Sequence, residues 1–292
     1  MATLAQWIAG ARPRTLPAAI SPILVGAGAA YQTGDIVWGF VVLAALVALA
    51  LQVGVNYAND YSDGVRGTDE VRVGPVRLVG QRLAAPRSVK TAAFTAFACA
   101  GVLGLTLVGL SRLWVMIPIG AVAILAAWYY TGGANPYGYL GLGEVFVFVF
   151  FGLVATLGTM ATMTSLTAAG GWGAIGVGAV ASAILVANNL RDIPTDSVTG
   201  KRTLAVRMGD RGTRTFYVSL VALTFVMTGL AALTSPFALL ALLAAPLAVR
   251  PVRAVVGGAT GRALIPALAG TGVFELAWAA LLAVGLALGQ HA

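Results

Sequence analysis

The sequence predicts an all-α polytopic membrane protein with about nine transmembrane helices. Hydrophobic residues make up 59% of its 292 residues, charged residues make up 10%, and the mean hydropathy is +0.90. An ordinary soluble domain carries about 25% charged residues, so this composition excludes a soluble fold. The chain is long enough for eight or nine helices of roughly 20 residues joined by short loops. We expect residues 1–292 to form a single transmembrane domain.

Nine apolar segments, taken in chain order, give the expected helices. A transmembrane helix needs about 20 predominantly apolar residues, and hydropathy windows of that length locate each segment. The first segment contains Pro17 and Pro22, and the eighth is short and contains Pro246. We expect these two to be kinked, tilted or re-entrant, because proline interrupts the helical hydrogen bonds. The expected spans are residues 15–32, 36–56, 91–110, 113–130, 145–164, 172–188, 216–234, 237–250 and 271–288.

The basic residues divide unevenly between the two sides of these spans. Seventeen of the 18 precede the first span or follow the second, sixth or eighth, and only Arg112 lies on the other side. Lysine and arginine concentrate in the cytoplasmic loops of membrane proteins. The sequence therefore predicts a multi-pass plasma-membrane protein with its N-terminus and the long polar loops in the cytoplasm. Anionic lipid headgroups account for the net charge of +8, so we expect no nucleic-acid partner.

Two polar clusters of similar spacing interrupt the apolar sequence. Asn56-x3-Asp60-x2-Asp63 ends the second span, and Asn188-x3-Asp192-x3-Asp196 ends the sixth. Residues three or four apart share one face of a helix, so each cluster forms a polar stripe at the predicted cytoplasmic end. We expect Pro194 to disturb the last turn of the second stripe. The matched positions indicate two duplicated four-helix units plus one further helix.

The two stripes are suited to binding metal ions and a polyphosphate. Carboxylates at membrane depth are costly and usually functional, and carboxylate oxygens are hard ligands that Mg²⁺ prefers. Two facing stripes could hold two Mg²⁺ ions with a diphosphate between them. Arginine offers a planar two-point contact to phosphate. The basic residues placed to neutralise the remaining charge are Arg66, Arg72, Arg191 and Lys201.

A third cluster, between the fourth and fifth spans, is rich in tyrosine and glycine. It runs Tyr129-Tyr130-Thr131-Gly132-Gly133-Ala134-Asn135-Pro136-Tyr137-Gly138-Tyr139. The predicted topology places it on the same side as the two polar stripes. Its aromatic faces and hydroxyls suit a flat aromatic substrate or the shielding of a cation. The alternative is an aromatic belt at the membrane interface.

Three other interpretations of these features stay open. The aspartates could cap helices and pair with loop arginines. Intramembrane acids also mark ion pathways in transporters, although these acids lie at helix ends rather than in the middle of spans. Residues 27–29 resemble a signal-peptide cleavage site, but Arg12 and Arg14 favour a retained cytoplasmic end. Cys99 is the only cysteine, which excludes an internal disulfide, and the Walker A, GxSxG and HExxH motifs are absent.

The polar motifs resemble those of the UbiA superfamily of intramembrane prenyltransferases. The resemblance rests on Asn59-Asp60-x2-Asp63 followed by Asp69, and on Asp192-x3-Asp196 followed by Lys201-Arg202-Thr203-Leu204. The expected nine helices agree with it over essentially the whole chain. Within the superfamily, three motifs are similar to the branch that prenylates 1,4-dihydroxy-2-naphthoate in menaquinone synthesis. They are Arg12-Pro13-Arg14-Thr15-Leu16-Pro17, Tyr130-Thr131-Gly132-Gly133 and Asn188-Asn189-x-Arg191-Asp192.

The resemblance implies a prenyl transfer that depends on Mg²⁺. The metal ions would be held by Asp60, Asp63, Asp192 and Asp196, and would bind the diphosphate of a polyprenyl diphosphate. With Arg191 and Lys201 they would stabilise the departing pyrophosphate while an allylic cation forms. The naphthoate ring would attack that cation, lose CO₂ and yield demethylmenaquinone, with the prenyl tail in a cleft open to membrane lipids. The residues expected to bind the substrates are Asn56, Asn59, Arg66, Asp69, Arg72, Tyr130, Tyr139, Asn188 and Arg14.

The sequence departs from the pattern of this branch at two places. Asn135 stands where a lysine often follows Tyr-Thr-Gly-Gly, so a positive charge expected near the diphosphate is missing. Asp69 lies six residues after Asp63, whereas the wider superfamily has four, which puts its role as a metal ligand in doubt. Another acceptor, 4-hydroxybenzoate or haem, is the main alternative, and the Tyr-Thr-Gly-Gly motif disfavours both.

Overall fold

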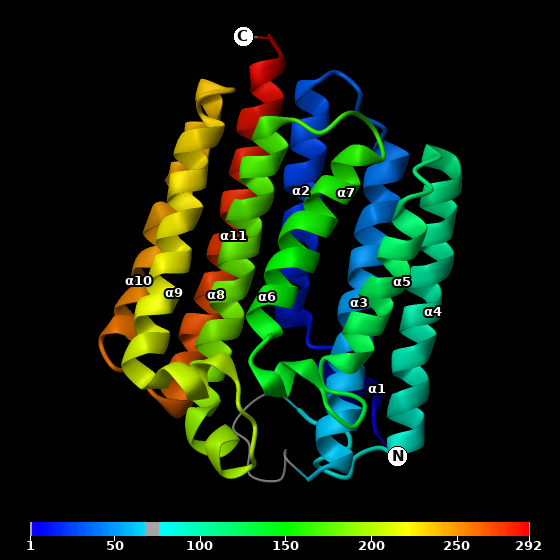
Figure 1. Ribbon diagram of the computed structural model, residues 1–292, viewed down its shortest axis with the longest axis vertical. Coiled ribbons are helices and arrows are strands. Elements are labelled where there is room, and N and C mark those ends of the chain that lie inside the picture. Colours follow the sequence, from blue (N-terminus) through cyan, green and yellow to red (C-terminus); the bar gives the residue numbers. More distant parts are fainter. Residues whose placement is uncertain (1, 68–75, 292) are drawn as a thin grey trace.

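In the part of the chain that the structure describes, nine long helical segments run side by side between the two ends of the molecule (Figure 1). The computed structural model describes residues 2–67 and 76–291. Each segment overlaps one predicted span, so the all-helical fold is confirmed for the described residues. The segments are α2 (Leu16–Gln32), α3 (Trp38–Val65), α4 (Pro86–Ser111), α5 (Met116–Tyr129), α6 to α7 (Gly143–Ala161), α8 (Ala168–Val198), α9 (Leu204–Ala231), α10 with the turns before it (Pro236–Val256) and α11 with the turn before it (Gly261–Leu288).

Most of these segments can cross a bilayer. Within the described ranges, seven are long and apolar enough to do so. The two shorter ones are α2, with 17 residues, and α5, with 14. A helix satisfies its own backbone hydrogen bonds, which is what an element surrounded by lipid requires. The chain is therefore a multi-pass membrane protein.

Two segments contain stretches of seven or more residues that are not α-helical. Between α6 (Gly143–Val147) and α7 (Ala155–Ala161) the chain forms a π-helix, and such wide turns are common near functional sites. The eighth segment begins with a 3₁₀ stretch, Pro236–Ala244, and continues as α10 (Ala245–Val256). A 3₁₀ helix rises about 2.0 Å per residue rather than 1.5 Å. The extra rise lengthens the segment whose apolar run is the shortest in the sequence.

Helix α8 forms the centre of the bundle. In its most apolar stretch 72% of the residues are buried, more than in any other candidate span. Small residues allow this packing, as in many membrane helix pairs. A methyl group at Gly152 would lie 2.5 Å from the Cα atom of Gly178, so the π-helical stretch and α8 touch backbone to backbone. Alanine at either position would push the two helices apart.

The two helices that carry the aspartate motifs extend beyond their predicted spans. Helix α3 continues to Val65 and α8 to Val198, so both motifs are helical. The expectation that Pro194 disturbs the last turn of α8 is wrong, because the helix continues past it. A proline removes a single backbone donor, and so near a helix end the loss is limited to one hydrogen bond. Asp192 and Asp196 therefore stay one turn apart on one face.

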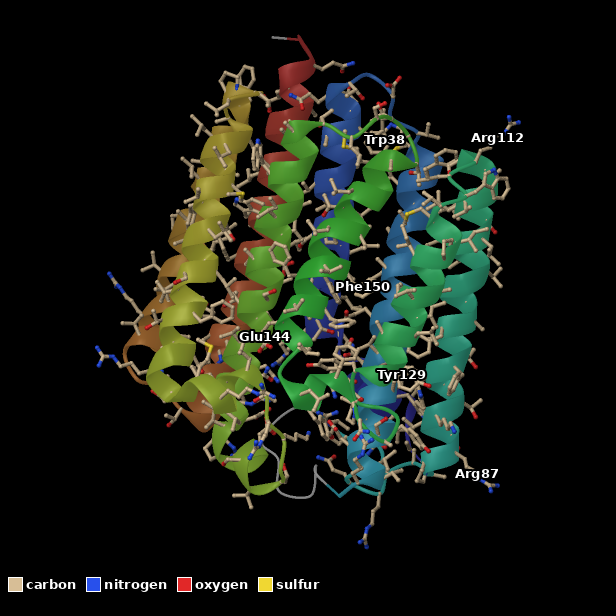
Figure 2. The ribbon with its side chains drawn as sticks, in the orientation of Figure 1. Trp38, Arg87, Arg112, Tyr129, Glu144 and Phe150 are labelled. Atoms are coloured by element: carbon tan, nitrogen blue, oxygen red, sulfur yellow. The ribbon has the colours of Figure 1, made fainter. Side chains whose placement is uncertain are left out.

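The bundle has two unlike ends. One end holds the C-terminus and the short links after α2 and α7, while the other holds the N-terminal helix α1 (Leu4–Gly10) and the links after α3, α5 and α8 (Figure 1). We call the second the motif end, because both aspartate motifs lie there. Arg87 lies at the motif end and Arg112 at the opposite end (Figure 2). This is the separation that the distribution of basic residues predicts.

Candidate functional site

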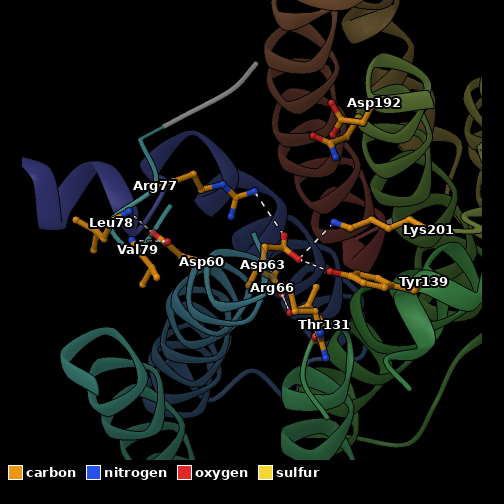
Figure 3. A network of polar contacts seen from close by, with 12 residues as sticks. Asp60, Asp63, Arg66, Arg77, Leu78, Val79, Thr131, Tyr139, Asp192 and Lys201 are labelled. Carbon is orange, nitrogen blue, oxygen red and sulfur yellow. Dashed lines mark hydrogen bonds and ion pairs between the residues drawn. The ribbon is translucent and has the colours of Figure 1, made fainter. Parts of the chain in front are cut away.

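Four predicted site residues near the end of α3 are buried: Asn56, Asn59, Asp60 and Asp63. A buried polar group is costly unless it is hydrogen-bonded. These four side chains have different partners, and the two aspartates point in different directions (Figure 3). The sequence motif alone therefore does not define a single face of ligands, and each residue needs a separate description.

Asn56 fixes the turn between α1 and α2. Its Nδ2 donates to the carbonyl of Ala11 at 2.9 Å and to Oγ1 of Thr15 at 3.0 Å. Gln52 also donates to Oγ1 of Thr15, at 3.0 Å. This turn places Arg12 at a φ of 54°, a left-handed conformation that costs a non-glycine residue energy. Asn56 therefore holds in place the turn that carries Arg12 and Arg14.

Asp60 anchors the loop that leads into α4. One carboxylate oxygen accepts from the backbone N–H of Leu78 at 2.6 Å, and the other accepts from that of Val79 at 3.0 Å. Hydrogen bonds from amides to a carboxylate are among the stronger ones in proteins. Figure 3 shows Asp60 turned toward this loop and away from Asp63. In this orientation Asp60 does not line the cavity, so its predicted role as a metal ligand would require its side chain to turn.

We expect Asp60→Ala to lower both the thermal stability and the activity of the protein. The change leaves two buried amides without an acceptor, which costs about 1–3 kcal/mol for each that stays dry. The apparent melting temperature of the purified protein in detergent measures this effect. An unchanged melting temperature would show that the loop does not depend on Asp60.

Asp63 joins three other segments of the chain. Its carboxylate accepts from the hydroxyl of Tyr139 at 2.6 Å, and Nζ of Lys201 lies 3.4 Å away. Nη2 of Arg77 lies 3.9 Å from the other oxygen. Lys201 also lies over the ring of Tyr139, 4.5 Å from its centre. The structure thus brings the first motif, the tyrosine-glycine cluster and the residue after the second motif together (Figure 3).

The tyrosine-glycine cluster is tied to the end of α3 by further bonds. Oγ1 of Thr131 donates to Oδ1 of Asn59 at 2.8 Å, and the Arg66 guanidinium contacts the carbonyls of Thr131 and Gly133. Tyr137 points elsewhere, donating to the carbonyl of Ala126 at 2.9 Å. Burial raises the pKa of the Tyr137 hydroxyl, so this group is a hydrogen-bond donor rather than a base.

On α8, the second motif forms a compact charge group. Arg191 donates through Nε and Nη2 to the two oxygens of Asp192, at 2.7 and 2.8 Å, and through Nη2 to Oδ1 of Asn188 at 2.9 Å. This two-point contact is the favoured geometry of an arginine–carboxylate pair. Asp192 would have to share or release Arg191 before it could bind a metal ion.

A cavity of about 1160 Å³ connects these groups. At the motif end its walls are polar, and further along they are formed by apolar residues of α3, α4, α5 and the α6–α7 segment. The predicted site residues that line it are Arg14, Asn56, Asn59, Asp63, Tyr130, Tyr139, Asn188, Arg191, Asp196 and Lys201. Asp60, Arg66 and Asp192 do not line it, and Asp69 and Arg72 lie outside the described residues.

Some residues at the cavity were not singled out from the sequence. Arg77 was counted as one of many loop arginines, and nothing in the sequence shows that its loop folds back to Asp63. Asn189 belongs to a motif, but the sequence indicates no role for it. Glu144 gave a usable signal, since it is one of few acids at the start of an apolar run. Such intramembrane acids are functional candidates by default.

Residues 19–264 match the UbiA prenyltransferase family. The chain is 54% identical over 291 residues to the 1,4-dihydroxy-2-naphthoate octaprenyltransferase of Mycobacterium tuberculosis, with 99% of both chains covered. It is 36% identical over 296 residues to the Escherichia coli protein of the same name, covering 98% of this chain and 96% of that one. A solved structure, a UbiA homologue from Archaeoglobus fulgidus bound to GPP and Mg²⁺, shares the fold. The TM-score is 0.66 at 12% identity, over 95% of this chain and 99% of that one.

Proposed function

The chain belongs to the UbiA prenyltransferase family, and we propose that it transfers a polyprenyl group from a polyprenyl diphosphate to 1,4-dihydroxy-2-naphthoate. The observation that carries this proposal is the 54% identity, over nearly the full length of both chains, to a relative named for that reaction. In the reaction the C–O bond to the diphosphate breaks and a C–C bond forms at the ring. Pyrophosphate and CO₂ leave, and the product is the reduced form of demethylmenaquinone.

The diphosphate binds at the polar end of the cavity. Asp63 and Asp196, one from each motif helix, line this end together with Lys201 and Arg191. The described residues include no group of three or more metal-binding side chains. Proteins usually bind Mg²⁺ through one or two carboxylates, while substrate phosphates and water complete its shell. Asp63 and Asp196, which line the cavity, would hold the metal, whereas Asp60 and Asp192, which do not line it, would have to turn toward the cavity to join them.

The basic residues of the cavity stabilise the leaving group. When bound, Mg²⁺ neutralises diphosphate charge and so favours departure of pyrophosphate. Lys201 is held between Asp63 and the ring of Tyr139, which fixes its position before the substrate arrives. Fixed charges aimed at developing negative charge need no rearrangement during the reaction, and this lowers the barrier. Arg191, within the second motif, supplies a second positive group.

The apolar part of the cavity receives the prenyl chain. Leu105 on α4 and Ile117 on α5 line it and are also exposed on the outer surface, 59% and 43% respectively. The apolar end of the cavity therefore reaches the face that lipid covers, and a long chain can extend into the membrane. We assign the acceptor to the region of Arg14, Tyr130 and Tyr139, where a cation and aromatic hydroxyls line the wall.

An assay with isolated membranes tests the choice of acceptor. A polyprenyl diphosphate is supplied with 1,4-dihydroxy-2-naphthoate, 4-hydroxybenzoate or a haem in turn, and prenylated products are identified by mass spectrometry. We expect product with the naphthoate. Product with 4-hydroxybenzoate or haem alone would move the protein to another branch of the family.

We expect Lys201→Ala to weaken use of the prenyl donor by about tenfold in kcat/KM, because a contact to a charged group is worth about 1.5–3 kcal/mol. The KM for the aromatic acceptor should stay nearly unchanged. Lys90→Ala is the matched control, since Lys90 is the only other lysine and does not line the cavity. A selective loss of acceptor affinity in Lys201→Ala would show that the two substrate positions are assigned the wrong way round.

We propose that the motif end faces the cytoplasm of a plasma-membrane protein, because 17 of the 18 basic residues belong to that side. A reporter that is active only outside the cytoplasm should be silent when fused after Gly67, Pro136 or Lys201. The same reporter should be active when fused after Gly34 or at the C-terminus. Activity after Pro136 would reverse the orientation.

A further inference from the structure

Glu144 and Asn189 form a buried pair between α6 and α8. Nδ2 of Asn189 donates to Oε1 of Glu144 at 2.8 Å, and the two residues are only 7% and 4% exposed. Oγ of Ser182 donates to the backbone carbonyl of Glu144 at 3.2 Å, so α8 holds this residue at two points. Figure 2 shows Glu144 at the motif-end start of the α6–α7 segment, beside α8. The pair is therefore fixed in a rigid part of the fold.

This pairing determines which way the Asn189 carboxamide faces. Because the amide nitrogen is directed at Glu144, the carbonyl oxygen Oδ1 points to the other side of the side chain. Asn189 lines the cavity, whereas Glu144 does not. Among the described residues, no donor contacts Oδ1 of Asn189, although the Nδ2 atom is bonded. The pair thus presents a hydrogen-bond acceptor to the cavity.

The part of the cavity near this pair is aromatic. The ring centre of Tyr137 lies 3.9 Å from that of Phe146 in a stacked arrangement, and 5.5 Å from that of Tyr130. Tyr130, Tyr137, Phe146 and Phe150 all line the cavity. Aromatic rings pack well against another flat ring in stacked or edge-on geometry. A polar acceptor beside an aromatic wall suits a hydroxylated aromatic ring more than a prenyl chain.

Burying the carboxyl group of Glu144 lowers the stability of the fold if the side chain serves only for packing. Its second carboxyl oxygen, Oε2, is buried and has no hydrogen-bond partner in the part of the chain that the structure describes. An apolar side chain of similar size would avoid this cost. The carboxyl group accepts the hydrogen bond from Nδ2 of Asn189, and an apolar side chain could not.

We propose that Asn189 is a specificity-determining residue whose Oδ1 accepts a hydrogen bond from a ring hydroxyl of the aromatic acceptor, and that Glu144 is the positioning residue that orients it. The inference rests on the proposed function. In 1,4-dihydroxy-2-naphthoate the 1-hydroxyl bonds to the neighbouring carboxylate, so the 4-hydroxyl is the free donor. A donated hydrogen bond from this hydroxyl also leaves more electron density on the ring that attacks the prenyl cation.

This contact is tested by measuring the binding of two related naphthoates to the wild-type protein and to Asn189→Leu. Dissociation constants are measured without the prenyl donor, so that no ligand is consumed, for 1,4-dihydroxy-2-naphthoate and for 1-hydroxy-2-naphthoate, which lacks the 4-hydroxyl. We expect Asn189→Leu to weaken the first ligand about tenfold and to change the second less than about twofold. An equal effect on both ligands, or none on either, would overturn the proposal. Gln290→Leu, which removes an exposed carboxamide at the opposite end of the bundle, is the control.

Variants of Glu144 test the positioning role. Glu144→Leu should show the same selective loss as Asn189→Leu, while Glu144→Gln, whose side-chain oxygen can still accept from Nδ2, should recover most of the affinity. The KM for the prenyl donor should stay within about twofold in all three variants. A parallel rise in the donor KM of Glu144→Leu would identify a merely structural role and reject the inference.

Failure of the role assigned to Asn189 can be distinguished from failure of the proposed function. If the wild-type protein forms no product from 1,4-dihydroxy-2-naphthoate, the proposed function fails. If it forms product but Asn189→Leu still distinguishes the two naphthoates as the wild type does, the proposed function stands and the role of Asn189 is refuted.

Discussion

Replacing Asp63 by alanine should lower kcat by at least about a hundredfold, the range seen when a key electrostatic group of an active site is removed. Asp63 contacts Tyr139, Lys201 and Arg77, and it lines the cavity at the end assigned to the diphosphate. Its loss removes a proposed metal ligand and frees Lys201 from its fixed position. Turnover of a polyprenyl diphosphate and the naphthoate by the purified variant measures the effect.

Asp210→Ala is the matched control for Asp63→Ala. Asp210 lies near the start of α9, pairs with Arg214 at 2.7 Å and does not line the cavity. Its removal should change kcat less than about twofold, because exposed ion pairs contribute little. Activity of Asp63→Ala close to that of Asp210→Ala would rule out the proposed site.

Removal of divalent metal should abolish activity. The proposed diphosphate end has two carboxylates on its wall, Asp63 and Asp196, beside the cations Lys201 and Arg191. The negative charges of these two carboxylates repel a diphosphate in a low-dielectric site unless a divalent cation lies between them. We expect EDTA to stop product formation, and added Mg²⁺ to restore it.

Full turnover in excess chelator would refute the metal-dependent model. A transporter gives a different result, since it would move a substrate across proteoliposomes without releasing pyrophosphate. Pyrophosphate release that depends on both Mg²⁺ and the aromatic acceptor separates the two classes of protein.

Much of the fold can be predicted from the sequence, because lipid allows few structures. All nine predicted spans correspond to helical segments, including the irregular eighth one that contains Pro246. Helix ends were less predictable, as shown by α3 and α8, which extend about ten residues past their apolar runs. One face of each extension is polar and is covered by loops. Hydropathy windows detect only apolar runs, so they do not detect this burial.

The sequence predicts a set of candidate site residues but not how they are arranged. Helical spacing places Asp60 and Asp63 near one another, yet Asp60 bonds to Leu78 and Val79 while Asp63 faces the cavity. The difference depends on a loop some 15 residues further along the chain, which no local pattern encodes. The arrangement also bears on position 135, where asparagine stands in place of the lysine common in this branch. Asn135 is exposed and does not line the cavity, whereas Lys201 is buried beside Asp63.

The most direct test of the account is the stoichiometry of the reaction in purified protein. The acceptor is supplied with a ¹³C-labelled carboxylate, and prenylated product, pyrophosphate and labelled CO₂ are measured in the same samples over time. We expect the three to appear in equal amounts, and the rate at which each appears to fall at least about a hundredfold with Asp63→Ala. Prenylated product that retains the labelled carboxylate, or pyrophosphate released without any prenylated product, would contradict it.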